Sequence, residues 1–343
     1  MVDTIKLAMS QNTLLTLYID FLVLVFGLVV GSFLNVVGLR LLSGEGIVFP
    51  PSKCPKCNTR LKWYDNIPVL AYILLRGKCR YCKAPISWQY PVVEACTAIM
   101  FLLIFLKFGV TFVTPMLFIL TGASIVMCIT DFREQVIFDW VSMPLIPIGL
   151  VYSFFNLGAT DGVPINLWGF SIPWSFVSAL IGIIIALIFF EGFSLITKLI
   201  MQHRAFGEGD TIIAMIFAAW FGWKAVILTI ILGLFMQAVF TIPLLIIKLF
   251  KTKDKVATIS FSVLLLSAVI PVICNHFNWA YSGIGSLLLV FVTLGMAGIS
   301  ALTFLRRMRE LKSYTLLPFG PALIAGGFIV IFFGEQILSY LSF

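Results

Sequence analysis

Long apolar runs, separated by short charged clusters, occupy most of this sequence. An α-helix needs about 20 consecutive apolar residues to cross the hydrocarbon core of a bilayer. Because 61% of the residues are hydrophobic and only 11% are charged, the chain could not cover a soluble surface with polar groups. The pattern therefore predicts an all-α polytopic membrane protein of about ten transmembrane helices. We place them near residues 14–39, 91–108, 112–130, 139–156, 174–198, 206–223, 224–249, 258–276, 281–304 and 316–341.

The distribution of Lys and Arg predicts which loops face the cytoplasm, where these residues are enriched. No small-residue cleavage site follows the first apolar run, so we expect a retained span and not a removed signal peptide. If the N-terminus lies outside, then 20 of the 23 Lys and Arg residues fall within or just beside the inside loops 40–90, 131–138, 199–205, 250–257 and 305–315. The net charge of +8 is therefore a signal of topology, and we expect no nucleic-acid partner.

The inside loop at 40–90 is the one sizeable soluble segment, and it contains two CxxC pairs separated by 21 residues. Tetrahedral zinc is commonly held by two such pairs, and neighbouring Lys and Arg residues help to keep thiols deprotonated. Two disulfides are the alternative, but a reducing cytoplasm disfavours them. Four Cys ligands leave no open position, so the zinc would be structural. The predicted ligands are Cys54, Cys57, Cys79 and Cys82.

Acidic residues gather where apolar runs meet the inside loops. Asp139 and Asp210 fit the role of helix N-terminal caps, where a negative charge is favourable. Asp131 does not fit it, because it ends an apolar run, and a carboxylate is disfavoured at a helix C-terminus. Two carboxylates on one membrane face can share a proton and activate a water molecule. Helix capping and paired catalysis therefore both stay open at this point.

Several longer motifs carry a resemblance to a known family. The segment "GEGD", which begins at Gly207, matches the GxGD signature of membrane-embedded aspartyl proteases. The chain also resembles the bacterial type IV prepilin peptidase and N-methyltransferase family over most of residues 27–250 and over 316–334. The motifs that carry this resemblance are "GSFLNVVGLRL" from Gly31, "LRGKCRYCKAPIS" from Leu75, "YPVVEACTA" from Tyr90 and "LPFGPALIAGG" from Leu317.

The resemblance implies a bifunctional enzyme of the bacterial inner membrane, with its active sites facing the cytoplasm. Such an enzyme cleaves the leader peptide of type IV prepilins or pseudopilins after a Gly. It then methylates the new N-terminal amine with S-adenosylmethionine. The implied partners are prepilin or pseudopilin substrates of type IV pilus or type II secretion systems, together with membrane lipid.

The resemblance also assigns roles to individual residues. By motif, Asp131 and Asp210 stand at the positions of the two catalytic carboxylates, with Asp139, Gly207 and Gly209 in support. Residues implied for methyl transfer are Gly77, Glu94 and Asn35. Gly77 equally fits a plain turn in a zinc knuckle. Asn35 and Glu94 equally fit buried polar groups held between helices.

On this basis we divide the chain into functional segments. Residues 1–39 hold the first span and 40–90 the zinc loop, which the resemblance associates with methyl transfer. The remaining segments are the protease core at 91–250, two extra spans within 251–315, and the last span at 316–343.

The sequence departs from the family pattern at three places. Phe138 stands where Pro is common, Ile212 stands where many members carry Lys, and two extra spans precede the last helix.

Two alternative functions compete with the prepilin peptidase. One is a GxGD protease that cuts inside membrane spans, but those proteases lack the double CxxC loop. The other is a transporter with a zinc-stabilised loop that uses the acids as a proton relay. An inverted repeat would favour the transporter, and none is visible in the sequence.

Overall fold

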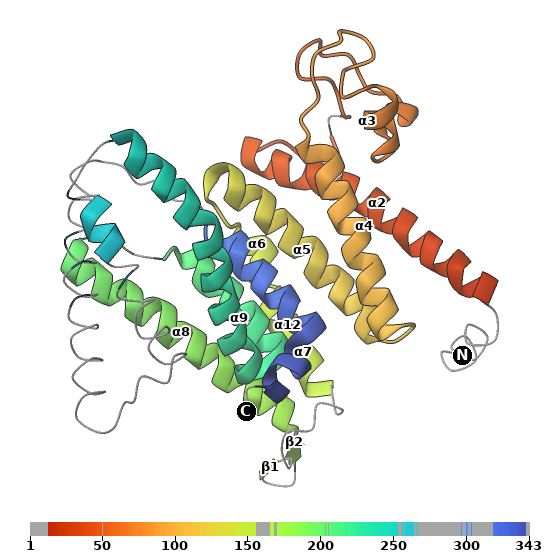
Figure 1. The fold of residues 1–343 in the computed structure, drawn as a ribbon. Helices are drawn as coiled ribbons and strands as arrows, with labels where there is room; N and C mark the ends of the chain where they lie inside the picture. Colours follow the sequence, from red (N-terminus) through yellow and green to blue (C-terminus); the bar gives the residue numbers. More distant parts are fainter. Residues whose placement is uncertain are drawn as a thin grey trace, which may run out of the picture. The chain divides into compact units, whose positions relative to one another are not determined.

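The computed structural model describes residues 13–49, 51–155, 165–167, 170–202, 204, 206–252, 256, 258–263, 266, 296, 300, 303 and 318–340. Within these residues the fold is helical, apart from one antiparallel pair of three-residue strands. The elements, numbered as in Figure 1, are α2 (Thr13–Ser43), η1 (Trp63–Asn66), α3 (Leu70–Leu74), α4 (Gln89–Phe108), α5 (Val113–Glu134), α6 (Asp139–Ser142), α7 (Leu145–Phe155), β1 (Ile165–Leu167), β2 (Phe170–Ile172), α8 (Trp174–Met201), α9 (Glu208–Thr252) and α12 (Gly320–Tyr340).

Six helices among the described residues are long and apolar enough to cross a membrane, which makes the chain a multi-pass membrane protein. They lie in α2, α4, α5, α8, α9 and α12.

The expected count of ten spans is confirmed only in part: the run at 139–156 differs from the prediction, and the division near 223 agrees with it. The run at 139–156 forms the short helices α6 and α7, because Pro144 interrupts it. The runs at 206–223 and 224–249 are two helices that meet at a kink inside α9, where Gly222 has φ 82° and ψ −175°. The expected runs at 258–276 and 281–304 lie largely outside the described residues.

The chain forms two compact units, which we describe separately. The first contains Met1–Met236 and Pro318–Phe343, and the second contains Gln237–Leu317. In the second unit, Thr303 Oγ1 donates a hydrogen bond of 3.2 Å to Ser260 Oγ, which joins two stretches that are distant in the sequence. All the sites discussed below lie in the first unit.

Helices α2, α4 and α5 lie side by side in the first unit (Figure 1). Small residues on α2 make this packing close. A Cβ built on Gly27 would lie 2.6 Å from Ala98 Cα, and one built on Gly31 would lie 2.8 Å from Glu94 Cα. A Cβ built on Gly38 would lie at a similar distance, 2.8 Å, from Ile129 Cγ2 of α5. Backbone approach through small residues is the usual way in which membrane helices associate.

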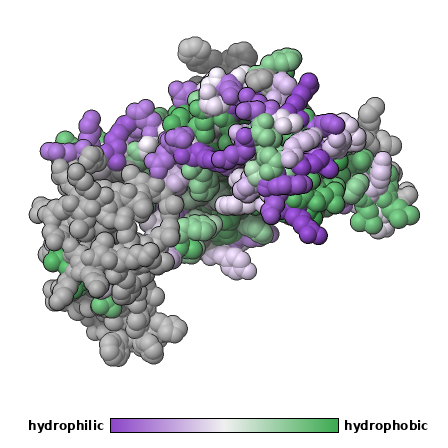
Figure 2. All heavy atoms as spheres, turned by 90° about the horizontal axis from the view of Figure 1, so that it is seen from above, coloured by the Kyte–Doolittle hydropathy of each residue, from purple (hydrophilic) through white to green (hydrophobic). Residues whose placement is uncertain are grey.

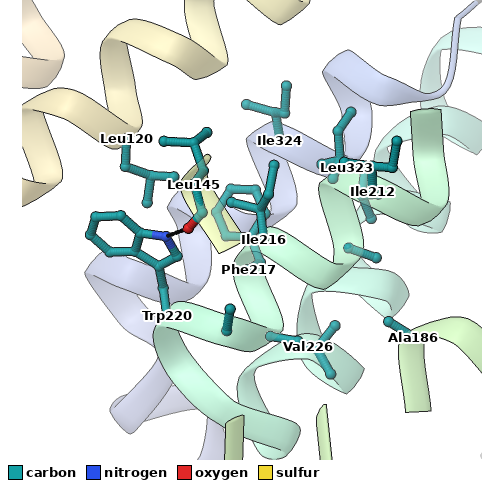
Figure 3. Close-up of a cluster of buried hydrophobic side chains, with 14 of the residues drawn as sticks. Leu120, Leu145, Ala186, Ile212, Ile216, Phe217, Trp220, Val226, Leu323 and Ile324 are labelled. Atoms are coloured by element: carbon teal, nitrogen blue, oxygen red, sulfur yellow. Dashed lines mark hydrogen bonds between the residues drawn. The ribbon is translucent and has the colours of Figure 1, made fainter. Parts of the chain in front are cut away.

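A second contact region joins α5, α7, α8, α9 and α12 through one buried hydrophobic cluster. Trp220 is the largest fully buried side chain in it, and its indole nitrogen donates a hydrogen bond of 2.9 Å to the Leu145 carbonyl (Figure 3). Gly149 leaves room for the indole ring, because a Cβ there would lie 2.3 Å from Trp220 Cδ1. This cluster fixes the first turns of α9 and α12 against the end of α5.

The segment between α2 and α4 forms a compact loop at one end of these helices (Figure 1). Figure 2, which views this end of the molecule, shows hydrophilic side chains gathered over the loop and hydrophobic ones toward the edges. Because α5 runs antiparallel to α4, its C-terminal residues return to the same end as this loop.

Candidate active site and cysteine cluster

Asp131 lies in the last turn of α5, where its side chain is buried. Its Oδ2 atom has no hydrogen-bond partner among the residues that the structure describes. A Cβ built on Gly320, the first residue of α12, would lie 2.5 Å from this oxygen. Gly320 thus presents bare backbone to the carboxylate. A buried carboxylate in a membrane helix with an unpaired oxygen is a candidate for function.

Asp210 lies in the first turn of α9, and its Oδ2 accepts a hydrogen bond of 3.0 Å from the Gly207 backbone N–H. The reach from the third helical residue back to the residue before the helix is one half of a capping box. The structure therefore provides the helix cap that the sequence left open. A capping role does not exclude catalysis, because a carboxylate has several acceptor positions.

The motifs of the two Asp residues meet in space. Ile137 lies against Gly209, and a Cβ built on Gly209 would lie 2.6 Å from Ile137 Cδ1. Ile213 lies one turn after Asp210. A Cβ built on Gly320 would lie 3.0 Å from Ile213 Cδ1, and the same position is close to Asp131 Oδ2. These two contacts bring together the segments of the chain that carry Asp131 and Asp210.

The expected supporting residues differ in their surroundings. Gly209 is the contact point for Ile137, and Gly207 donates to Asp210. Asp139 is the first residue of α6 and is exposed, and the N-cap position before it is occupied by Phe138. The structure thus places Gly207 beside Asp210 and Gly209 beside Ile137, and it leaves Asp139 at the surface.

Arg204 joins the two helices on either side of it through charged contacts. It forms a salt bridge of 2.6 Å to Glu191 of α8 and one of 2.5 Å to Glu208 of α9. Thr211 donates a hydrogen bond of 3.1 Å to the other oxygen of Glu191. This group was not predicted from the sequence, although Glu191 stands inside an apolar run, where an ionisable residue is a functional candidate.

Aromatic rings connect the GEGD turn with the start of α12. The Phe206 ring lies 5.0 Å from that of Phe190 and 5.2 Å from that of Phe319, between ring centroids. Phe319 directly precedes Gly320, so this contact sets the position of the backbone beside Asp131. The motif "LPFGP" contains this signal, but nothing in the sequence pattern places it beside the carboxylates.

The four Cys residues of the two CxxC pairs form one cluster, with sulfur atoms all within 4.8 Å of one another. Cys54 Sγ and Cys82 Sγ are 3.8 Å apart. Sulfur atoms bound tetrahedrally to zinc at about 2.3 Å would be separated by about 3.8 Å. The residues present therefore fit zinc, and their arrangement as a single group of free thiols favours a metal site over two disulfides.

Both CxxC pairs adopt the same backbone geometry. Cys54 and Cys79 each donate a backbone hydrogen bond five residues ahead, to Thr59 and Ala84 at 3.0 and 2.8 Å. Hydrogen bonds from Thr59 lower the pKa of the Cys57 thiol to about 6. Backbone hydrogen bonds from Cys82 and Tyr81 lower the pKa of Cys79. A lowered pKa favours the thiolate, which is the form that binds metals.

Asp65 connects the segment between the pairs to the second pair. Its buried carboxylate accepts hydrogen bonds from Arg80 at 2.7 Å, from the Tyr81 hydroxyl at 3.0 Å and from the Lys62 backbone N–H at 3.2 Å. Burial alone would raise the pKa of Asp65, but these hydrogen bonds hold it below its usual range.

The three residues implied for methyl transfer have different surroundings. Asn35 is buried between α2 and α4 and donates a hydrogen bond of 3.2 Å to the Tyr90 carbonyl. Glu94, also buried, accepts one of 2.7 Å from the Val69 N–H. Gly77 has φ 68°, and a Cβ there would lie 3.0 Å from Tyr72 Oη. This geometry suits the turn alternative for Gly77.

Two family models match the chain. Residues 25–108 match the bacterial peptidase A24 N-terminal domain, and residues 118–242 match the type IV leader peptidase family. No solved structure matches significantly.

Several curated relatives carry the name prepilin leader peptidase/N-methyltransferase. The one from Myxococcus xanthus is 30% identical, over 59% of this chain and 56% of that protein. The one from Stutzerimonas stutzeri is 27% identical over 93% of both chains. The one from Klebsiella pneumoniae is 32% identical, over 60% of this chain and 87% of that protein. The chain therefore belongs to the type IV leader peptidase family, as its motifs predicted.

Proposed function

We propose that this protein is a bifunctional prepilin peptidase and N-methyltransferase, whose peptidase site is formed by Asp131 and Asp210. The names of its relatives support both activities. The observation that carries the peptidase site is the convergence of Asp131 and Ile213 on Gly320, which brings the ends of α5, α9 and α12 together.

The two carboxyl groups act as an acid and a base. One of them is ionised and takes a proton from a water molecule, which attacks the scissile carbonyl after the leader's Gly. The other is protonated, polarises that carbonyl and gives a proton to the leaving amine. Positioned acid–base groups of this kind contribute about 10²–10⁴-fold to the rate. Gly320 leaves space beside Asp131, and Gly207 orients Asp210 through its N–H.

The substrate is a prepilin or pseudopilin with a basic leader on the cytoplasmic side of the bacterial inner membrane. Three ends meet on the side of the molecule that bears the Cys-rich loop: the end of α5, the start of α9 and the start of α12. The bias in Lys and Arg puts this side in the cytoplasm. The substrate helix unwinds at the cut, because an intact helix shields its carbonyls. Asp139, exposed at the start of α6, contacts the substrate.

The loop at 40–90 serves the second activity. Cys54, Cys57, Cys79 and Cys82 hold a structural zinc ion that stabilises this loop. S-adenosylmethionine supplies the methyl group for the new N-terminal amine. Two further spans lie near 258–276 and 281–304, where the sequence has long apolar runs.

The test of the peptidase uses purified full-length protein and a synthetic prepilin, with product masses measured in the presence and absence of S-adenosylmethionine. Asp131→Asn and Asp210→Asn should each abolish cleavage, and the double variant should be no worse, because coupled catalytic residues are not additive. Both variants should still methylate a substrate that is supplied already cleaved. Asp139→Asn is the matched control and should keep measurable cleavage.

Asp210→Asn separates catalysis from helix capping, because the amide oxygen of Asn can still accept a hydrogen bond from the Gly207 N–H. A pure capping role would leave that variant active, and even full loss of a cap costs only about 1 kcal/mol of stability. Substantial cleavage by either single variant would rule out the Asp pair. A wild-type protein that cleaves without methylating would point to another GxGD protease, and one that does neither would point to the transporter.

A further inference from the structure

A large cavity lies between the Cys-rich loop and the adjoining ends of α2 and α4, with a volume of about 880 Å³. Its lining includes Ser32 and Val36 of α2, Tyr72 and Val69 of the loop, and Glu94 of α4. Small-molecule and cofactor sites typically have volumes of about 300–1,000 Å³. Arg133, two residues after Asp131, also lines the cavity. The cavity therefore extends toward the end of α5, where the proposed cleavage would release a new amine.

Glu94 is the feature of this cavity that most needs a ligand. Its side chain is only 6% exposed, and its Oε2 accepts the Val69 N–H at 2.7 Å. Among the described residues, no Lys, Arg or His forms a salt bridge with it. Ionising a buried carboxyl group is costly unless a positive charge meets it. A cationic ligand in the cavity would supply that charge.

The backbone beside Glu94 is strained in a way that is typical of binding sites. Val69 has φ 59° and ψ −48°, and a β-branched residue rarely adopts a positive φ. This conformation aims the Val69 N–H at the Glu94 carboxylate. Strained residues of this kind cluster at ligand clamps, where the surrounding structure holds them in place.

The lining also includes the aromatic residues Phe33, Tyr72, Tyr81 and Tyr90. Aromatic side chains stack on purine bases, so this part of the lining suits a ligand with a flat ring. We propose that S-adenosylmethionine binds in this cavity with its sulfonium group facing Glu94. This inference rests on the proposed N-methyltransferase function and adds to it the place of the donor and the residue that recognises its charge.

The test is binding to purified full-length protein by equilibrium dialysis, with S-adenosylmethionine and S-adenosylhomocysteine as the two probes. The second probe lacks the methyl group and hence the positive charge on sulfur. Glu94→Gln should weaken binding of S-adenosylmethionine on the order of tenfold and change binding of S-adenosylhomocysteine much less, since only the former loses a charge-assisted contact. Glu335→Gln is the matched control, because Glu335 of α12 is exposed and does not line the cavity.

Two further measurements locate the site independently of Glu94. Val36→Phe, which fills the cavity, should weaken both probes alike. A photoactivatable azido-adenine analogue of S-adenosylmethionine should label peptides within residues 29–94. Unchanged binding in both variants, or labelling confined to other segments, would overturn the cavity assignment while leaving the methyltransferase in place. No binding of either probe to the wild type would instead overturn the methyltransferase proposal, and this inference with it.

Discussion

Gly320 lies directly against Asp131: a Cβ added to this glycine would come within 2.5 Å of the carboxylate Oδ2. The two residues are far apart in the sequence, yet the absence of one side chain decides how much space the other has. The space beside Asp131 is therefore set by α12, a helix that contributes no acidic residue to the site.

This contact predicts that Gly320→Ala slows prepilin cleavage. The new methyl group must displace Asp131 or move α12, and a displacement of about 1 Å at a catalytic group can cost about 10²-fold in rate. Initial rates of cleavage with a synthetic prepilin would measure the effect. Gly192→Ala in α8 is the control, because a Cβ there meets no atom within 4 Å. Equal rates for the two variants would contradict a role for this contact.

The Cys cluster predicts about one zinc ion per chain in purified protein. A double variant with Cys54→Ser and Cys79→Ser removes one ligand from each CxxC pair and should lose the metal, as measured by atomic emission. A chelator should release the same metal from the wild type. Both treatments should reduce methylation more than cleavage, because the Asp pair lies outside the loop. Cys96→Ser is the control, since Cys96 lies in α4 and outside the cluster. Full metal retention by the double variant would exclude this site.

Arg204 offers a test that separates positioning from stability. Its side chain and those of Glu191 and Glu208 are 40%, 42% and 79% exposed, and exposed ion pairs contribute only about 0.2–1 kcal/mol to folding. Arg204→Ala should therefore leave the unfolding temperature nearly unchanged while lowering the cleavage rate, because the turn before Asp210 loses its tether to α8. Arg204→Lys should recover part of the rate, since lysine keeps the charge but cannot span both carboxylates in a planar fork. The control is Lys198→Ala, and a matching loss of rate there would remove the case for the tether.

Asp65 predicts a pH-dependent contribution to the stability of the loop. Its pKa is lowered in the folded protein, so its stabilising effect is present above its unfolded pKa and is lost as the pH falls through the folded one. Asp65→Asn should make the loop more sensitive to protease at neutral pH. The difference from wild type should shrink once the pH falls below about 4, the usual range of Asp. Glu45→Gln should show no such difference. A gap that stays constant down to strongly acidic pH would contradict the ion pair's role.

Much of the fold could be predicted because membrane helices have a simple length rule. The runs that became α2, α4, α5, α8 and α12 were long and uniform, so their positions follow from hydropathy. The turn at Gly222 also falls at the predicted boundary between the runs at 206–223 and 224–249. The break at Pro144 was harder to predict, because this residue ends a helix inside an apolar run without changing the average hydropathy of its surroundings.

Of the two candidate sites, one could be predicted from local sequence and the other could not. The CxxC spacing predicts a cluster because both halves of the site are local in sequence. The surroundings of Asp131 could not be foreseen, because they depend on Gly320 and Ile213, which a pattern within one helix does not connect. The pairing of Glu191 could not be predicted from its own helix, because its partner Arg204 lies in the connection that follows.

The place of Gly320 also has a consequence for the time at which activity can appear during synthesis. Both Asp residues leave the ribosome long before α12, so a nascent chain that stops short of Pro318 already carries its carboxylates but lacks the wall beside Asp131. Insertion of the final helix completes the site. The order of the chain thus delays proteolysis until the whole membrane bundle has assembled.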